Sequence, residues 1–110
     1  MADINYCGSQ DVDPHLVLRD REPLDFRPSL KVWNHSPTGF SWGYGGSGPA
    51  QLALALLLDA TGNKRVALAM HQEFKWQFVA RWSSSWTMTS SEIQKWVAEQ
   101  PVAQAEMRLV

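Results

Sequence analysis

The chain has only one cysteine, Cys7, among its 110 residues. This excludes a disulfide within the chain and a zinc site built from several cysteines. The single thiol, and an N-terminus without a basic region followed by an apolar run, predict a reducing, cytoplasmic location. Long apolar runs are also missing: the longest covers only residues 52–58, whereas a helix that crosses a bilayer needs about 20 residues. We therefore expect no association with a membrane.

An excess of charge of one sign is equally lacking. Ten basic and eleven acidic residues leave a formal net charge of -1, and the pI is about 6.3. A protein that binds the phosphate backbone usually carries a strongly basic surface, so the composition argues against nucleic acid as the partner. Hydrophobic residues make up 45% of the chain and charged residues 19%, a balance that favours a folded domain over disorder. The length suits a single domain over residues 1–110.

Three short runs in the N-terminal part alternate between apolar and polar residues, at residues 4–7, 15–18 and 30–33. Alternation of this kind is typical of strands, whose successive side chains point to opposite faces of a sheet. Glycine and proline residues separate the runs and favour turns between them. The pattern predicts a small antiparallel sheet formed by the N-terminal half of the chain.

Helical patterns dominate the second half of the chain. They predict three helices, at about residues 48–61, 64–82 and 90–99. The first is apolar nearly all round, which indicates a buried central helix. We expect Gly48 to cap it, Gln51 to reach back to that cap, and Gly62 to end it in a left-handed turn. Thr89 and Glu92 should form a capping box at the start of the third helix.

The order of these elements predicts the fold class. Strands come first and helices follow, without alternating strand–helix–strand units, so we expect an α+β fold. In this fold a small antiparallel sheet from the N-terminal half packs against about three helices. Residues 106–109 form one further candidate strand.

Residues 34–49 are unusual because five glycines and three aromatic residues fall within one loop that leads into the first predicted helix. Glycine lets the backbone approach a ligand closely, and a helix N-terminus offers unpaired N–H groups to an anion. The segment is therefore a candidate binding loop for a small anionic ligand such as a nucleotide or phosphate. The candidate residues are His35, Ser36, Tyr44, Gly45, Gly46, Ser47 and Gly48. In the alternative interpretation the glycines only let the chain turn against a buried helix.

Motifs of phosphate binding and catalysis do not match this loop. A P-loop needs a lysine after its last glycine, and no lysine lies between Lys31 and Lys64. His35 and Ser36 are neighbours, but adjacency does not direct a serine hydroxyl toward a histidine ring, and a turn explains the pair more simply. We therefore predict no catalytic residue, and an enzyme is the less favoured interpretation.

Metal-binding patterns are also missing from the sequence. The three histidines, His15, His35 and His71, lie far apart, and no His-x-x-x-His pair is present. Such spacing is what places two imidazoles on one face of a helix beside a metal ion. The sequence thus predicts neither a metal site nor a cofactor.

Tryptophan, by contrast, is abundant, with six residues. They are too many for all of them to be central, because each buried indole N–H needs a hydrogen-bond acceptor. On the second predicted helix, Trp76 lies about 200° around the axis from Phe74 and so outside the apolar stripe. Exposed tryptophans are common anchors of protein interfaces. The candidate interface residues are Trp33, Trp42, Trp76 and Trp86.

Residues 35–57, HSPTGFSWGYGGSGPAQLALALL, resemble the signature of a family of short uncharacterised proteins, described as a domain of unknown function of the 6166 type. Other positions are similar to that family as well. They are Tyr6, Gly8, Phe74, Lys75, Trp86, Glu92, Ile93 and Trp96. Members of the family look like products of bacteria, archaea, phages and plasmids, so the resemblance implies a mobile-element setting. It transfers no activity and no functional residue.

Two functions follow as expectations. The first is a non-enzymatic protein-binding module, in the form of a small inhibitor of a host defence system (anti-CRISPR-like), whose partner is another protein. Its basis is the small domain, the surplus of tryptophan and the lack of a catalytic constellation, together with the implied mobile-element setting. The alternative is a domain that binds or converts a nucleotide or another phosphorylated compound at the glycine-rich loop.

Overall fold

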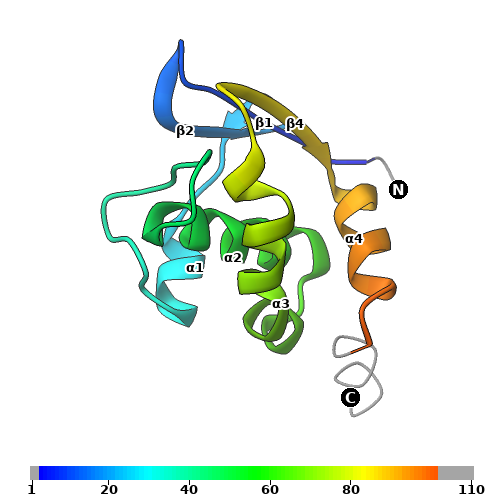
Figure 1. The fold of residues 1–110 in the computed structure, drawn as a ribbon. Coiled ribbons are helices and arrows are strands. Elements are labelled where there is room, and N and C mark those ends of the chain that lie inside the picture. The colour runs from blue at the N-terminus through cyan, green and yellow to red at the C-terminus, as the bar shows by residue number, and fades with distance from the viewer. Residues whose placement is uncertain (1–2, 102–110) are drawn as a thin grey trace.

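The computed structural model describes residues 3–101, which form a four-stranded antiparallel sheet with helices packed on one of its faces (Figure 1). The strands are β1 (Asn5–Ser9), β2 (Asp13–Arg19), β3 (Glu22–Pro23) and β4 (Ser85–Thr89), in the order β3-β2-β1-β4. The helices are α1 (Arg27–Val32), α2 (Ser47–Thr61), α3 (Lys64–Gln77) and α4 (Ser90–Ala98), with a short 3-10 helix, η1, at Val79–Arg81. The predicted α+β class is confirmed.

Helix α2 is the buried central helix that its composition predicts. Leu52, Leu54 and Leu56 are each 0% exposed, and the helix packs against α1, α3 and α4. Gly62 ends α2 in the left-handed conformation, with φ of 63°, so the predicted glycine stop is also confirmed. None of the helices within residues 3–101 is long and apolar enough to cross a membrane.

Residues 30–33 are not a strand, contrary to the expectation from their alternation. They belong mostly to α1, which starts at Arg27 with a proline in its first turn, where the missing N–H of Pro28 costs nothing. The carboxylate of Asp25 accepts a 3.0 Å hydrogen bond from the Arg27 backbone N–H and so supports this start. Because α1 packs on α2, start signals and tertiary contact outweigh an alternation of only four residues.

Strand β4 is not anticipated by the sequence analysis, and it extends the sheet beyond the N-terminal half. Its residues alternate as a strand should, since Trp86 and Met88 are buried whereas Ser85 and Thr87 are exposed. The run is short and begins at the last of three consecutive serines, which favour a loop. Pairing with β1 sets its register and places Trp86 beside Gly8.

Two helix boundaries also differ from the prediction. Helix α2 begins at Ser47, so Gly46 and not Gly48 occupies the cap position. Helix α3 ends at Gln77 instead of continuing to residue 82, because the backbone turns at the next residue and leads into η1. The earlier start of α2 brings Gly48, the last glycine of the loop, into its first turn.

Helix α4 begins with the predicted capping box. Thr89 Oγ1 accepts a hydrogen bond from the Glu92 N–H at 3.2 Å, and Glu92 accepts one from the Thr89 N–H at 3.0 Å. The carboxylate of Asp3 accepts a further bond from the Ser91 N–H at 2.9 Å. This contact ties the chain before β1 to the start of α4. The candidate strand at residues 106–109 lies outside the described residues.

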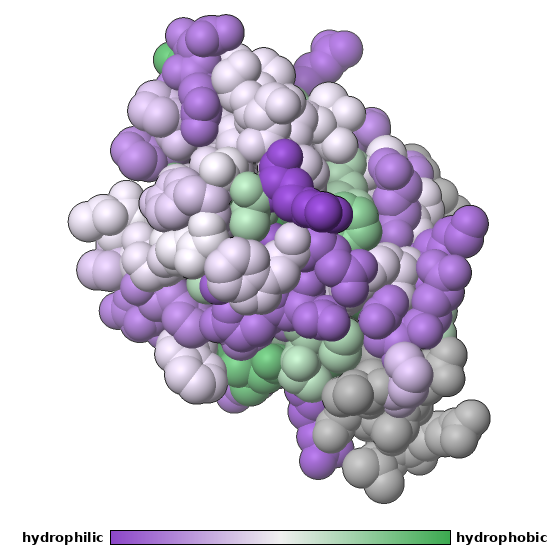
Figure 2. Space-filling view, viewed as in Figure 1, coloured by the Kyte–Doolittle hydropathy of each residue, from purple (hydrophilic) through white to green (hydrophobic). Residues whose placement is uncertain are grey.

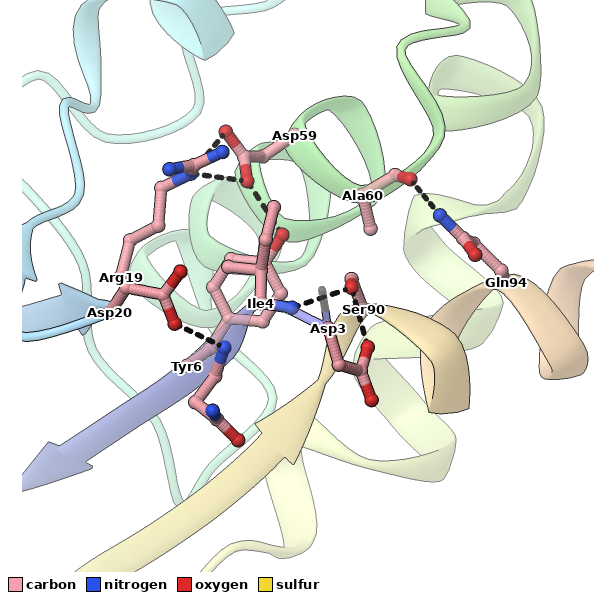
Figure 3. A network of polar contacts seen from close by, with 10 residues as sticks. Asp3, Ile4, Tyr6, Arg19, Asp20, Asp59, Ala60, Ser90 and Gln94 are labelled. Carbon is pink, nitrogen blue, oxygen red and sulfur yellow. Dashed lines mark hydrogen bonds and ion pairs between the residues drawn. The ribbon is translucent and has the colours of Figure 1, made fainter. Parts of the chain in front are cut away.

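A polar network joins the sheet to the end of α2 (Figure 3). The Asp59 carboxylate accepts a 2.6 Å hydrogen bond from the Tyr6 hydroxyl and pairs with the Arg19 guanidinium at 2.8 Å. The helix dipole opposes a carboxylate at the C-terminal end of a helix, and Arg19 offsets that charge. Burial, and then the bond to Asp59, raise the pKa of the Tyr6 hydroxyl, which therefore remains the proton donor at neutral pH. The network fixes β1 and β2 against α2.

Gly8 makes room for two indole rings on the inner face of β1. A Cβ at this position would lie 2.7 Å from Nε1 of Trp86 and 2.9 Å from the ring of Trp42, which is closer than packed side chains approach one another. Trp86 has little freedom to retreat, because its ring stacks on Trp82 with 4.0 Å between centroids.

Replacing Gly8 should therefore disturb the core. We expect Gly8→Ala to lower the free energy of unfolding by about 1–3 kcal/mol, the usual cost of overpacking. Urea unfolding followed by tryptophan fluorescence measures this change. Ser85→Ala is the matched control on the adjacent strand, where the side chain is exposed and the change should stay within about 0.5 kcal/mol. Equal stability of Gly8→Ala and the wild type would contradict the close packing.

Candidate functional site

The glycine-rich loop between α1 and α2 is held in place by one buried glutamine. The side-chain oxygen of Gln51, a residue that is 0% exposed, accepts hydrogen bonds from the backbone N–H of His35 at 2.7 Å and of Ser36 at 3.0 Å. Its amide donates to Ser29 Oγ at 2.9 Å. The expected bond from Gln51 back to the cap of α2 is thus replaced by a clamp on a distant segment. The clamp therefore fixes the position of the His35 backbone, from which its side chain extends.

The N-terminus of α2 is covered by side chains of the loop itself. A Cβ at Gly46 would overlap the ring of Tyr44, and a Cβ at Gly48 would overlap the hydroxyl of Ser41. These two side chains are also joined, with 2.8 Å between Ser41 Oγ and Tyr44 Oη. Gly45 packs in the same way under the ring of Trp76. The glycines therefore allow close packing against their own neighbours, as the structural interpretation of the loop requires.

Three large aromatic side chains that border or belong to the glycine-rich loop are more than half exposed. We call Trp33, Tyr44 and Trp76 the aromatic face; they are 55%, 54% and 57% exposed. Trp33 follows α1, Tyr44 belongs to the loop, and Trp76 lies on α3 above Gly45. Figure 2 shows pale, weakly polar residues over the loop at the left of the view.

The other two candidate interface residues, Trp42 and Trp86, are inside the protein. They are 1% and 6% exposed and pack edge to face, with 5.8 Å between ring centroids. Neither indole N–H has a hydrogen-bond acceptor within residues 3–101. The lack of an acceptor therefore does not keep these two tryptophans at the surface, contrary to the expectation from composition; they pack over Gly8. In this structure Trp42 and Trp86 offer no surface to a partner.

His35 and His71 come together although 35 residues separate them in the sequence. Their Nε2 atoms are 2.9 Å apart. Nδ1 of His71 lies 2.9 Å from the Leu68 carbonyl oxygen, so Nδ1 carries the hydrogen and Nε2 of His71 is an acceptor. The side-chain nitrogen of Gln72 also lies 3.5 Å from this Nε2. His35 then donates from its own Nε2. No spacing rule reveals this pair, since it depends on how the loop folds over α3.

The surroundings keep both imidazoles uncharged near neutral pH. Burial lowers the pKa of His35, and the nearby charges of His71 and Lys75 lower it further. Burial also lowers the pKa of His71, an effect that the Leu68 carbonyl opposes and Lys75 reinforces. The Lys75 ammonium lies 4.3 Å from the centroid of the Trp76 ring. The pair thus lies between Trp33, which stacks on His35, and a cation.

The outer face of the sheet carries a second surface that the sequence analysis does not identify. A cavity of about 620 Å³ there is lined by Cys7, Leu16 and Leu18, among other residues. The pairing of Cys7 with Leu18 and with Thr87 places these side chains in one row across three strands. This face is opposite to the one that the helices cover.

The Gln51 clamp can be tested directly. Gln51→Leu leaves two backbone N–H groups without their acceptor and removes one hydrogen bond from the Ser29 hydroxyl, which still donates to the Phe26 carbonyl. We therefore expect the free energy of unfolding to fall by about 3 kcal/mol. Amide hydrogen exchange should accelerate at His35 and Ser36 in particular. Glu73→Leu, at an exposed position on α3, is the control and should leave stability and exchange at His35 and Ser36 unchanged. Unaltered exchange at His35 in Gln51→Leu would show that other contacts hold the loop.

The histidine pair predicts a pH dependence with a definite sign. Both folded-state pKa values lie below the ordinary 6.5, so on acidification the unfolded chain takes up protons first. Stability should be level above about pH 6.5 and decline below it, toward the folded-state pKa values. Thermal melts between about pH 5 and pH 8 measure this. His35→Asn should flatten the decline, whereas His15→Asn, which leaves the pair intact, should preserve it; the same slope in both variants would contradict the assignment.

Comparison with known proteins places this site within a family. No curated protein and no solved structure matches the chain. A family model matches residues 6–99, which include the glycine-rich loop, the histidine pair and the whole aromatic face. The match confirms the family that the resemblance indicates: the chain belongs to the family of unknown function DUF6166.

Proposed function

We propose that this protein is a non-enzymatic binding module whose aromatic face docks on another protein. The observation that carries this proposal is that Trp33, Tyr44 and Trp76 are each more than half exposed. All three contact the glycine-rich loop or belong to it: Trp33 stacks on His35, Trp76 packs over Gly45 and Tyr44 over Gly46. Tryptophan and tyrosine are enriched among the residues that dominate binding energy at protein interfaces. Isolated exposed apolar residues need no explanation, but three large aromatic rings in one region do.

Two side chains of the aromatic face are supported by packing contacts. The Trp33 ring lies parallel to that of His35, with 5.1 Å between centroids and 5° between planes. Trp76 is supported by Gly45 below it and by the Lys75 ammonium. Side chains that are already fixed lose little conformational entropy when a partner covers them. This support favours a preformed interface over a surface that orders only on binding.

The specific form that we propose is a small inhibitor that blocks a component of a host defence system, anti-CRISPR-like in its action. The mobile-element setting implied by the family resemblance supports this form, as does the small size of a domain that would act by occupying a surface. The alternative, a nucleotide or phosphate site at the glycine-rich loop, has less support. Tyr44 and Ser41 pack against the first turn of α2, where an anion would have to bind.

Affinity capture with matched variants tests the docking surface. The wild-type chain, immobilised in lysate of its host, should retain one protein in stoichiometric amount. Removing a central tryptophan typically costs about 2 kcal/mol or more, so Trp33→Ala combined with Trp76→Ala should abolish retention. Leu16→Ser combined with Leu18→Ser is the control on the outer face of the sheet and should retain the partner.

Two outcomes would contradict the proposal. One is the absence of any stoichiometric partner for the wild type. The other is loss of the partner with the sheet-face variant but not with the tryptophan variant, which would move the interface to the sheet. Circular dichroism of each variant establishes that it is folded.

A further inference from the structure

Strand β4 forms one edge of the sheet, and within residues 3–101 no strand lies on its outer side. The Ser90 N–H donates to the Ile4 carbonyl at 2.9 Å, so the even-numbered residues of β4 bond to β1. In an antiparallel ladder, the residues between them direct their main-chain groups the opposite way. The N–H and C=O groups of Ser85 and Thr87 therefore point away from β1, toward the free edge.

The free edge of β4 is accessible. Ser85 and Thr87 are both exposed, and the main packing partners of β4 among the described elements are β1 and α4. Helix α4 follows the strand directly and runs away from it (Figure 1). At the end of the strand, the Thr89 N–H donates to the Glu92 carboxylate at 3.0 Å. A second strand could thus pair along most of the length of β4.

The two edges of the sheet differ in their protection against such pairing. Strand β3, at the opposite edge, consists of Glu22 and Pro23 alone, and a short edge strand with a charge and a proline resists pairing. Strand β4 has five residues, without charge or proline, and pairs with β1 in a continuous register. No residue from 82 to 91 is charged. An edge of this kind favours the addition of another strand.

The sequence of β4 is complementary to itself. A two-fold axis at Thr87 places this residue opposite its equivalent in a second copy. The other opposed pairs are Ser85 with Thr89 and Trp86 with Met88. Because opposed residues share a face of the sheet, hydroxyl side chains meet on the outer face and apolar side chains on the inner face. A two-fold interface requires this self-complementarity.

We propose that two copies of this chain associate through antiparallel pairing of their β4 strands, which joins their sheets into one. The two Thr87 residues exchange both main-chain hydrogen bonds, and the Ser85 N–H of each copy donates to the Thr89 carbonyl of the other. No like charges oppose one another along the paired strands. A strand edge is a small interface, so the association is weak and depends on concentration. It uses no residue of the aromatic face and does not depend on the proposed protein-binding function.

Sedimentation velocity of the untagged protein over a concentration series tests this pairing, with a reductant present to keep Cys7 from forming a disulfide between chains. We expect the mean mass to rise with concentration toward twice the 12.4 kDa of one chain. Thr87→Lys places two like charges opposite each other, so it should weaken the dimer at least about tenfold. Glu22→Lys is the matched control, because it adds a lysine at an exposed position on the opposite edge, and it should dimerise as the wild type does.

A mixing experiment tests the two-fold register. Thr87→Glu should also be monomeric by itself, whereas an equimolar mixture of Thr87→Glu and Thr87→Lys should regain the dimer, because opposite charges then face each other. Damage to the fold would not be repaired by mixing, and circular dichroism of each variant checks the fold independently. The proposal is overturned if the wild type stays monomeric up to about 1 mM, a concentration that detects even weak association. It is also overturned if Thr87→Lys dimerises like the wild type, or if the mixture stays monomeric.

Discussion

The burial of α2 from Gly48 to Leu57 is the constraint on which the rest of the structure depends. Such a buried segment cannot leave a polar side chain without partners, because desolvation of an unpaired amide costs several kcal/mol. Gln51 is 0% exposed, and it meets this requirement by binding two backbone N–H groups of the loop and one hydroxyl of α1. The path of the loop after α1 is therefore a consequence of one amide in the core. The position of His35, and with it the histidine pair, follows from that path.

The two ends of α2 make different kinds of contact. The C-terminal end is attached to the sheet by polar contacts, whereas the N-terminal end lies beneath exposed aromatic side chains. At its C-terminal end, Asp59 pairs with Tyr6 and Arg19 and attaches the sheet. At its N-terminal end, glycines allow aromatic rings to pack closely against the backbone. The first arrangement uses charge to fix the sheet on the helices. The second leaves Tyr44 and Trp76 at the surface, where they are available to a partner.

The composition indicates that some tryptophans are exposed, but it does not indicate which of them are buried. An excess of indole side chains correctly suggests that some are exposed, and the position of Trp76 on its helix indicates that it is one of them. The sequence cannot show that Trp42 and Trp86 pack against each other over Gly8. That arrangement requires β4 to pair with β1 in one register, and this pairing joins segments about 80 residues apart.

Local signals in the sequence determined most of the helical part of this protein. The apolar run of α2, its glycine stop and the capping box of α4 each act within a few residues, so they can be identified without tertiary information. The strand β4 and the Gln51 clamp were decided by contacts between distant segments, and packing on α2 adds to the local start signals of α1. The same is true of the meeting of His35 with His71, because imidazoles on a loop and on a helix become neighbours only when the core between them has formed. Sequence spacing records neighbours along the chain, whereas the chemistry of this site depends on neighbours in space.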